Sequence, residues 1–456
     1  MCGCFFLKKP TAHIVHFPNY SEKESIGADC YWMEKLRVKV RNSFMLSKIE
    51  NFLEKYKDKI FWTLLVCAYV LAAILFCAQS FRFKGLYLSD LDLHINSALR
   101  NGGSGYSMES TLVALIYWLT GKNAVACKII FPFVLAFVIL MTPLAVASLH
   151  SFLDRTEEGT SLGVSRNRYV GLFSIYIGPL VLPFIWFWFN TNNYNINAWH
   201  NSTFLEMRLF SVISLCLYFV IQADLRKGKR IRPSFWLMFT ACMFVSTWFK
   251  PSFFVGFAPV IAIWILIDML QSHGKLDKIK DQFLLGCTCI PSGLMVIMQY
   301  WKLYGSRENI SVVISSEMDD VNDNIRILLF LILPVIIFLF NRKKVISEYK
   351  NGNRAYVQII AMWLFNLLYT KMFVEIGRPG KNIGWGVRLA NYIVVIIYLR
   401  LFWINLLDLR KKIKEGQTVT TAERVYAIGV GAVLAWEMIC GLFYFFWVLI
   451  GQGYMI

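Results

Sequence analysis

Three side chains that can take part in proton transfer lie within five positions of one another. They are Asp90, Asp92 and His94, in the stretch LYLSDLDLHINSAL (86–99). On a helix Asp90 and His94 share a face because they are four positions apart, whereas on an extended segment all three project to the same side. Both geometries permit a carboxylate–imidazole pair, which could accept a proton from a hydroxyl group as a general base.

Four further clusters of polar residues are separated from this stretch and from one another by apolar runs. They are NTNNYNINAWHNSTFLEMR (190–208), TWFKPSF (247–253), EMDDVNDN (317–324) and EIGRPGKNIGWGVR (375–388). Cations stand beside aromatic residues in several of them, a combination that suits the binding of an anion and the stacking of a ring. These cations are Arg208, Lys250, Arg378 and Lys381.

The elements that must position these clusters are membrane-spanning helices. Of the 456 residues, 57% are hydrophobic and only 17% are charged, which is far more apolar than an ordinary globular domain. Apolar runs recur at about the 20 residues needed to cross a bilayer. The fold class is therefore an all-α polytopic membrane protein, for which we predict about eleven spans: 60–78, 128–149, 169–189, 207–223, 234–249, 252–270, 284–303, 326–340, 356–374, 386–406 and 425–450.

The basic residues predict the orientation of these spans. Most of the 47 lysines and arginines fall in the N-terminal segment and in alternate loops, and such residues collect on the cytoplasmic side. We therefore expect a cytoplasmic N-terminus, an external C-terminus and a multi-pass protein of the plasma or inner membrane. The +18 net charge is accounted for by topology and contacts with anionic lipids, without a nucleic-acid partner.

Two regions are expected along the chain. Residues 1–59 form a cytoplasmic segment without a cleavable signal peptide, in which 31–59 reads as a basic amphipathic helix on the membrane surface. Residues 60–456 form one transmembrane domain, whose first external loop is 79–127. Within that loop the stretch 110–121 is too short for a span and is expected to lie in the membrane interface.

With this orientation nearly every unusual polar cluster lies on the external side. A carboxylate, several cations and aromatic rings at the membrane surface indicate a lipid-phosphate substrate. Its phosphate would be bound by charge-assisted hydrogen bonds from Lys250, Arg378, Lys381 and Arg208. Further substrate contacts are expected from Trp199, His200, Asn201, Glu375, Asn382 and Trp385.

A family resemblance adds to this interpretation. A first span, a large external loop opening with LSDLDLH and about ten further spans resemble the glycosyltransferase C (GT-C) superfamily, and WHNST, FKPS and EIGRPGKNIGWG resemble patterns in bacterial polysaccharide-cluster members. The resemblance implies transfer of a sugar from a polyprenyl-phosphate donor to a glycan or glycolipid acceptor. It further implies that an acidic residue at the start of the first external loop is the catalytic base, with Asp90 the first choice and Asp92 the second.

Some alternatives remain open at this stage. A metal-free mechanism with inversion at the anomeric carbon is expected, with no cofactor. The alternative is a divalent ion, Mg²⁺ or Mn²⁺, shared by Asp90 and Asp92 with carboxylates of 317–324. A flippase or transporter of lipid-linked glycans is a second class, which would call for mid-span charges and internal symmetry. A polysaccharide polymerase is a third.

Overall fold

The computed structural model describes residues 44–100, 107–157, 161–177, 197–304, 311–314, 321–376 and 383–451. The chain divides into two compact units, Met1–Ile60 and Phe61–Ile456, which are treated separately. In the first unit the described residues begin with helix α2 (Phe44–Ser80). The amphipathic helix predicted over 31–59 thus lies outside the described residues up to position 43, and from Phe44 the chain is helical.

The described part of the second unit is almost entirely helical. After α2 the described residues form a short 3₁₀ turn, fourteen more α-helices and two short strands. In chain order they are η1 (Phe83–Gly85), α3 (Asp90–Arg100), α4 (Met108–Leu119), α5 (Ala124–Thr156), α6 (Gly163–Ser174), α8 (Ser202–Arg226), α9 (Pro233–Phe249), α10 (Ser252–Gln271), α11 (Leu276–Cys287), α12 (Ile290–Tyr304), β1 (Ser311–Ile314), α13 (Val321–Phe340), α14 (Arg342–Lys350), α15 (Ala355–Met372), β2 (Phe373–Ile376), α16 (Gly384–Lys414) and α17 (Thr421–Leu449).

Seven helical segments in the described residues are long and apolar enough to cross a membrane. They are Glu54–Ser80, Ala124–Thr156, Ser202–Arg226, Ser252–Gln271, Leu276–Lys302, Gly384–Lys414 and Thr421–Leu449. Shorter apolar helices at Met108–Leu119, Pro233–Phe249 and Phe330–Phe340 accompany them. The predicted polytopic helical architecture is confirmed. The count of eleven stays a prediction, because 178–189 of one expected span lies outside the described residues.

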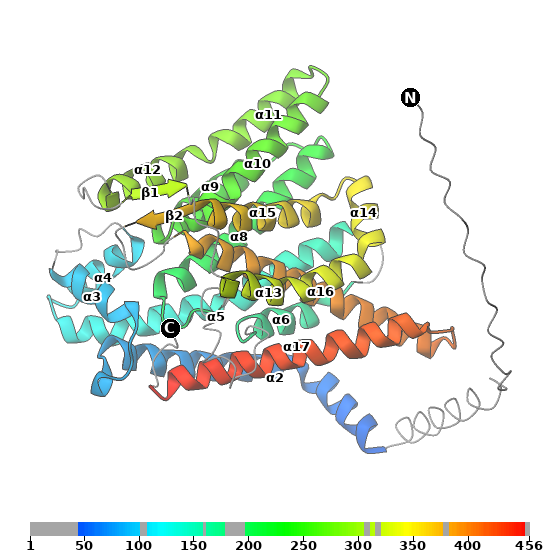
Figure 1. Ribbon diagram of the computed structural model, residues 1–456, viewed down its shortest axis with the longest axis horizontal. Coiled ribbons are helices and arrows are strands. Elements are labelled where there is room, and N and C mark those ends of the chain that lie inside the picture. Colours follow the sequence, from blue (N-terminus) through cyan, green and yellow to red (C-terminus); the bar gives the residue numbers. More distant parts are fainter. Residues whose placement is uncertain are drawn as a thin grey trace, which may run out of the picture. The chain divides into compact units, whose positions relative to one another are not determined.

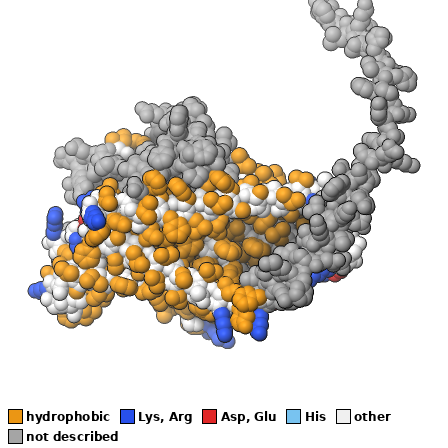
Figure 2. Space-filling view, turned by 90° about the horizontal axis from the view of Figure 1, so that it is seen from below, with side chains coloured by type: hydrophobic (Ala, Val, Ile, Leu, Met, Phe, Trp, Pro, Cys, Tyr) orange, Lys and Arg blue, Asp and Glu red, His pale blue; other side chains and the backbone are white. Residues whose placement is uncertain are grey.

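The surface of the bundle suits a hydrocarbon environment. Hydrophobic side chains cover most of the coloured part of the face shown in Figure 2, with lysine and arginine side chains near its edges. Several large apolar side chains are more than 70% exposed, including Leu237, Leu270 and Ile428. Such exposure would be unfavourable in water, whereas lipid tails solvate these side chains. The protein is therefore an integral multi-pass membrane protein.

Helices α8 and α16 form the centre of the second unit. The most apolar window of α8 is 78% buried inside the protein and that of α16 is 67% buried. Helix α8 packs on α5 and α9, and α16 packs on α15, α10 and α6. A helix enclosed on all sides can be apolar all round, and the run 386–402 of α16 is buried without interruption. The side chains at the starts of α8 and α16 are consequently held by well-packed elements.

The two ends of the bundle carry different elements (Figure 1). At one end lie α3, α4 and the β1–β2 pair, which we call the α3 end. Strands β1 and β2 are antiparallel, with Val312 opposite Glu375. The loop predicted at 79–127 contains both α3 and α4, so the short helix expected at 110–121 is present as a separate element. At the other end lies α14.

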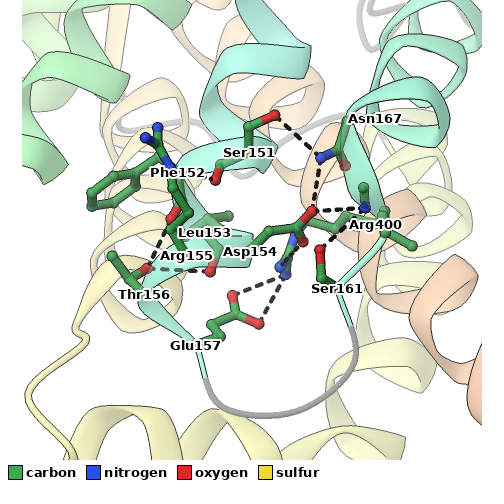
Figure 3. A network of polar contacts seen from close by, with 12 residues as sticks. Ser151, Phe152, Leu153, Asp154, Arg155, Thr156, Glu157, Ser161, Asn167 and Arg400 are labelled. Atoms are coloured by element: carbon green, nitrogen blue, oxygen red, sulfur yellow. Dashed lines mark hydrogen bonds and ion pairs between the residues drawn. The ribbon is translucent and has the colours of Figure 1, made fainter.

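A buried ionic network ties the helices together at the α14 end (Figure 3). Arg400 of α16 is fully buried; its Nη2 lies 2.8 Å from Asp154 Oδ1 and its Nη1 lies 2.9 Å from Glu157 Oε1. Lys344 Nζ of α14 is 2.9 Å from Glu157 Oε2. Asp154 also accepts a hydrogen bond of 2.9 Å from Asn167 Nδ2 of α6. These contacts hold α5, α6, α14 and α16 in one arrangement, because a buried charge deprived of its partner is costly.

Candidate functional site

Asp90 is the first residue of α3 and is held against the turn that precedes α8. Its backbone N–H donates to the carbonyl oxygen of His200 at 3.0 Å, and the Ser89 hydroxyl donates to the same carbonyl at 2.9 Å. The amide Nδ2 of Asn201 donates to the Asp90 carboxylate. The start of the first loop is thus joined to residues more than a hundred positions later. The Asp90 side chain remains partly exposed.

Asn201 connects this carboxylate to a buried lysine. Its Oδ1 accepts from the backbone N–H of Phe204 at 3.0 Å and so caps the N-terminus of α8, as asparagine often does. The same oxygen accepts from Lys250 Nζ at 3.3 Å. Lys250 follows the last residue of α9 and precedes Pro251, after which α10 begins. The residue is only 9% exposed, so its ammonium group is positioned by the fold.

Trp385, in the first turn of α16, is in contact with two cations. Lys250 Nζ is 4.1 Å from the ring centroid and the guanidinium carbon of Arg388 is 4.2 Å from it. The rings of Phe204 and His200 approach Trp385 at 5.2 Å and 6.3 Å. Two positive charges gathered around one aromatic ring create a local positive potential, which can hold an anion and leave a ring edge for an adjoining group.

His200 occupies the same cluster as a neutral side chain. Its Nδ1 is 3.2 Å from the Tyr444 hydroxyl of α17. Burial lowers the pKa of His200 to about 4; the nearby Asp90 carboxylate opposes this shift, and the positive charges of Arg388 and Lys250 add to it. At neutral pH the imidazole therefore carries no charge.

Asp92 points to a different environment, although it is only two positions from Asp90. Its carboxylate lies 3.1 Å from Lys128 Nζ and 3.8 Å from Arg82 Nε, and it accepts a hydrogen bond of 2.7 Å from Asn96. Positions two apart on a helix differ by roughly 200° in direction, so α3 sends the two carboxylates to different neighbours. Asp92 pairs α3 with α5, whereas Asp90 faces the Asn201–Lys250 cluster.

A buried glutamate that the sequence did not single out contacts the start of α8. Glu109, in the first turn of α4, is fully buried and accepts a hydrogen bond of 2.6 Å from the Ser202 hydroxyl. Burial raises the pKa of Glu109. The negative charge of Asp90 raises it further, whereas the positive charges of His94 and Lys250 lower it. Glu109 therefore retains its proton to a higher pH than an ordinary glutamate. The signal in the sequence was an acidic residue at the edge of an apolar helix.

Two of the predicted residues lie in the core. Trp199 is 1% exposed, and its ring is 4.7 Å from Phe445, 6.1 Å from Tyr176 and 6.4 Å from Phe76. Arg208 is fully buried; its guanidinium lies 4.5 Å from the ring of Tyr392 and donates to Asn197. These contacts suit packing around α8, so we leave both side chains out of the proposed substrate contacts.

Of the remaining predicted site residues, the structure describes Glu375 and His94. Glu375 is 7% exposed and lies on β2, and His94 is partly exposed on α3. The predicted site residues Arg378, Lys381 and Asn382 lie outside the described residues.

No metal site was found among the residues that the structure describes: no three His, Cys, Asp or Glu side chains are grouped to hold an ion. Positions 317–320 of the acidic run lie outside those residues.

Comparison with known proteins adds one finding about the fold. No protein-family model and no curated protein matches the chain. Among solved structures, the archaeal oligosaccharyltransferase AglB from Archaeoglobus fulgidus, in complex with an inhibitory peptide and a dolichol-phosphate, is similar with a TM-score of 0.51 at 8% identity. The similarity covers 87% of this chain and 56% of that one, so the chain spans little more than half of that enzyme. At this identity the similarity shows a shared fold.

Proposed function

We propose that this protein is a membrane glycosyltransferase of GT-C type that transfers a sugar from a polyprenyl-phosphate donor to a glycan or glycolipid acceptor. The observation that carries the proposal is the meeting of Asp90, Asn201, Lys250, Trp385 and Arg388 at the α3 end of the bundle. A base and cations at one membrane surface are what an attack on a lipid-phosphate sugar requires. The similarity in fold to an oligosaccharyltransferase in complex with a dolichol-phosphate supports the same class.

In the proposed reaction the Asp90 carboxylate accepts the proton of an acceptor hydroxyl. The freed oxygen attacks the anomeric carbon of the donor sugar, and the bond between that carbon and the phosphate oxygen breaks with its electron pair going to the phosphate. The single displacement inverts the anomeric configuration. Lys250 and Arg388 then stabilise the negative charge of the departing lipid phosphate.

The other residues of the cluster act through these groups. Asn201 orients the Asp90 carboxylate and the Lys250 ammonium group together, because one amide contacts both. His200 is neutral at pH 7. It therefore adds no positive charge that would compete with Lys250 and Arg388 for the phosphate, and it leaves proton transfer to Asp90. Trp385 supplies a ring beside the phosphate site against which a sugar or prenyl group could pack. Orientation follows the basic residues: the α3 end is external and the α14 end cytoplasmic.

The test is sugar transfer by the purified full chain in nanodiscs, with a synthetic polyprenyl-phosphate sugar and a membrane extract supplying the acceptor. Asp90→Asn is a close mimic in shape that can still accept the Asn201 hydrogen bond, so it removes the base with little change in packing. We expect a loss of transfer of about 10²–10⁴-fold with donor binding retained. The matched variant Asp92→Asn should transfer normally.

Two outcomes would contradict the proposal. Full activity in Asp90→Asn would remove that residue from the reaction. Wild-type protein that moves a labelled lipid-linked glycan across the bilayer without transferring sugar would instead show a flippase.

A further inference from the structure

A cavity at the α14 end has no part in the proposed reaction. Its volume is about 280 Å³, and it lies where the last turns of α5 and α8 meet the turn between α14 and α15. Gln222, Ala223, Arg226 and Lys227 line one side, and Gly352 and Arg354 line another. This is the end at which the basic loops gather, opposite the Asp90 cluster.

Positive charge exceeds negative charge around this cavity. Arg354 Nη1 contacts Asp268 Oδ1, and Arg226 Nη2 lies 3.9 Å from Asp268 Oδ2, so two guanidinium groups share one carboxylate. The side chains of Arg226 and Arg354 are 21% and 13% exposed, and the Asp268 side chain is 11% exposed. Lys227 adds a third, exposed cation at the rim. Half-buried cations without matching anions are unfavourable unless an anion joins them.

Hydrogen-bond donors at the cavity also lack acceptors. Gln222 is 2% exposed, and among the described residues nothing accepts a hydrogen bond from its Nε2 or from the Nε of Arg226. The Arg226 Nη1 group donates to the carbonyl of Gly352, and Arg354 Nη2 donates to Gln271 at 2.9 Å. Buried donors in folded proteins are nearly always paired, so an occupant rich in acceptor oxygens fits this cavity.

We propose that the cavity binds a negatively charged phosphate group. Guanidinium groups match the geometry of phosphate oxygens, and the excess positive charge selects an anion over a neutral polar molecule. The group would come either from an anionic lipid of the adjoining leaflet or from soluble phosphate. The lipid source has support from the predicted orientation, because anionic lipids are concentrated in the cytoplasmic leaflet. The proposal does not depend on the proposed function.

The test uses native mass spectrometry of the detergent-purified full chain titrated with phosphatidylglycerol or with zwitterionic phosphatidylcholine. Lys227→Gln removes the rim charge, and Ala223→Met fills the cavity without changing a charge. Lys227→Gln should weaken phosphatidylglycerol binding by roughly tenfold, about the effect of one hydrogen bond to a charged group. Ala223→Met should also weaken it, because the larger side chain takes up space that the phosphate group would occupy. Lys229→Gln is the matched control, because Lys229 is 64% exposed two positions away and does not line the cavity.

The arms of the experiment separate the sources of phosphate. Displacement of the lipid by millimolar inorganic phosphate would support the site and assign it to soluble phosphate. Retention of the lipid under the same conditions would support the site and assign it to a lipid headgroup. Equal phosphatidylglycerol binding by wild type and both cavity variants, with unchanged melting temperatures, would overturn the proposal. So would equal affinity for phosphatidylglycerol and phosphatidylcholine.

Discussion

The role assigned to Lys250 predicts a defined kinetic defect in Lys250→Gln. Lys250 is 9% exposed, and its ammonium group lies 3.3 Å from Asn201 Oδ1 and 4.1 Å from the Trp385 ring centroid. Glutamine can still hydrogen-bond to Asn201, but it brings no charge to the departing phosphate. A hydrogen bond to a charged group contributes about 1.5–3 kcal/mol, so kcat/KM should fall by roughly 10- to 150-fold.

The division of this loss between kcat and KM identifies the stage at which Lys250 acts. If the ammonium group mainly stabilises the leaving phosphate, then kcat falls and KM changes little. If it binds the donor phosphate equally before and during reaction, then KM rises instead. The assay is steady-state transfer over a range of donor concentrations, at low and high salt, since a charge interaction weakens with ionic strength.

A matched control guards against a loss caused by misfolding. Lys128→Gln removes another lysine at the α3 end, one that pairs with Asp92 and not with the Asn201 cluster. It should leave kcat/KM of the folded protein within about twofold, a change of less than 0.5 kcal/mol. If Lys250→Gln also stays within about twofold of wild type, while its melting temperature is unchanged, then the phosphate role of Lys250 is wrong.

Three further predictions concern stability. Asp92→Asn breaks a partly buried ion pair with Lys128 and should lower the free energy of unfolding by about 1–3 kcal/mol; thermal unfolding measures this, and no shift would contradict the pairing. Arg400→Gln leaves the Asp154 and Glu157 carboxylates buried without their guanidinium partner and should lower the free energy of unfolding by about 3–5 kcal/mol. A melting temperature equal to that of wild type would contradict this. Burial lowers the pKa of His200 from 6.5 to about 4 in the folded protein. As the pH falls below 6.5, His200 is therefore protonated in the unfolded chain before it is protonated in the folded protein. Stability due to His200 is thus full above pH 6.5 and declines toward pH 4, and His200→Gln should flatten that decline in melts at stepped pH.

Much of the architecture was accessible from sequence because membrane spans leave a long, simple signal. Apolar runs of sufficient length and their asymmetric basic flanks require no knowledge of packing. Asp90, Asn201, Lys250 and Trp385 were likewise selected because polar or unusual residues next to spans are costly and are retained for a reason. The structure brings these four together from segments far apart in the chain.

Other features depend on contacts that no local pattern contains. Both carboxylates of DLD were candidates for the base, and the rotation of α3, held by the hydrogen bond from Asp90 to His200, decides which of them faces Asn201. Trp199 was predicted to contact substrate because polar residues flank it in the sequence, yet its side chain packs among aromatic residues in the core. Glu109 is one acidic residue beside an apolar helix, and its burial against Ser202 depends on how α4 and α8 meet.

The distribution of the cluster along the chain has a consequence for biogenesis. Lys250 is synthesised well before its aromatic neighbour Trp385, and Tyr444, the partner of His200, is synthesised later still. At the usual pace of translation this interval is on the order of ten seconds. During that time the nascent protein holds a cation at the membrane surface without its later partners. A chain stalled or truncated in this window would therefore present a polar defect that membrane quality-control proteases can recognise.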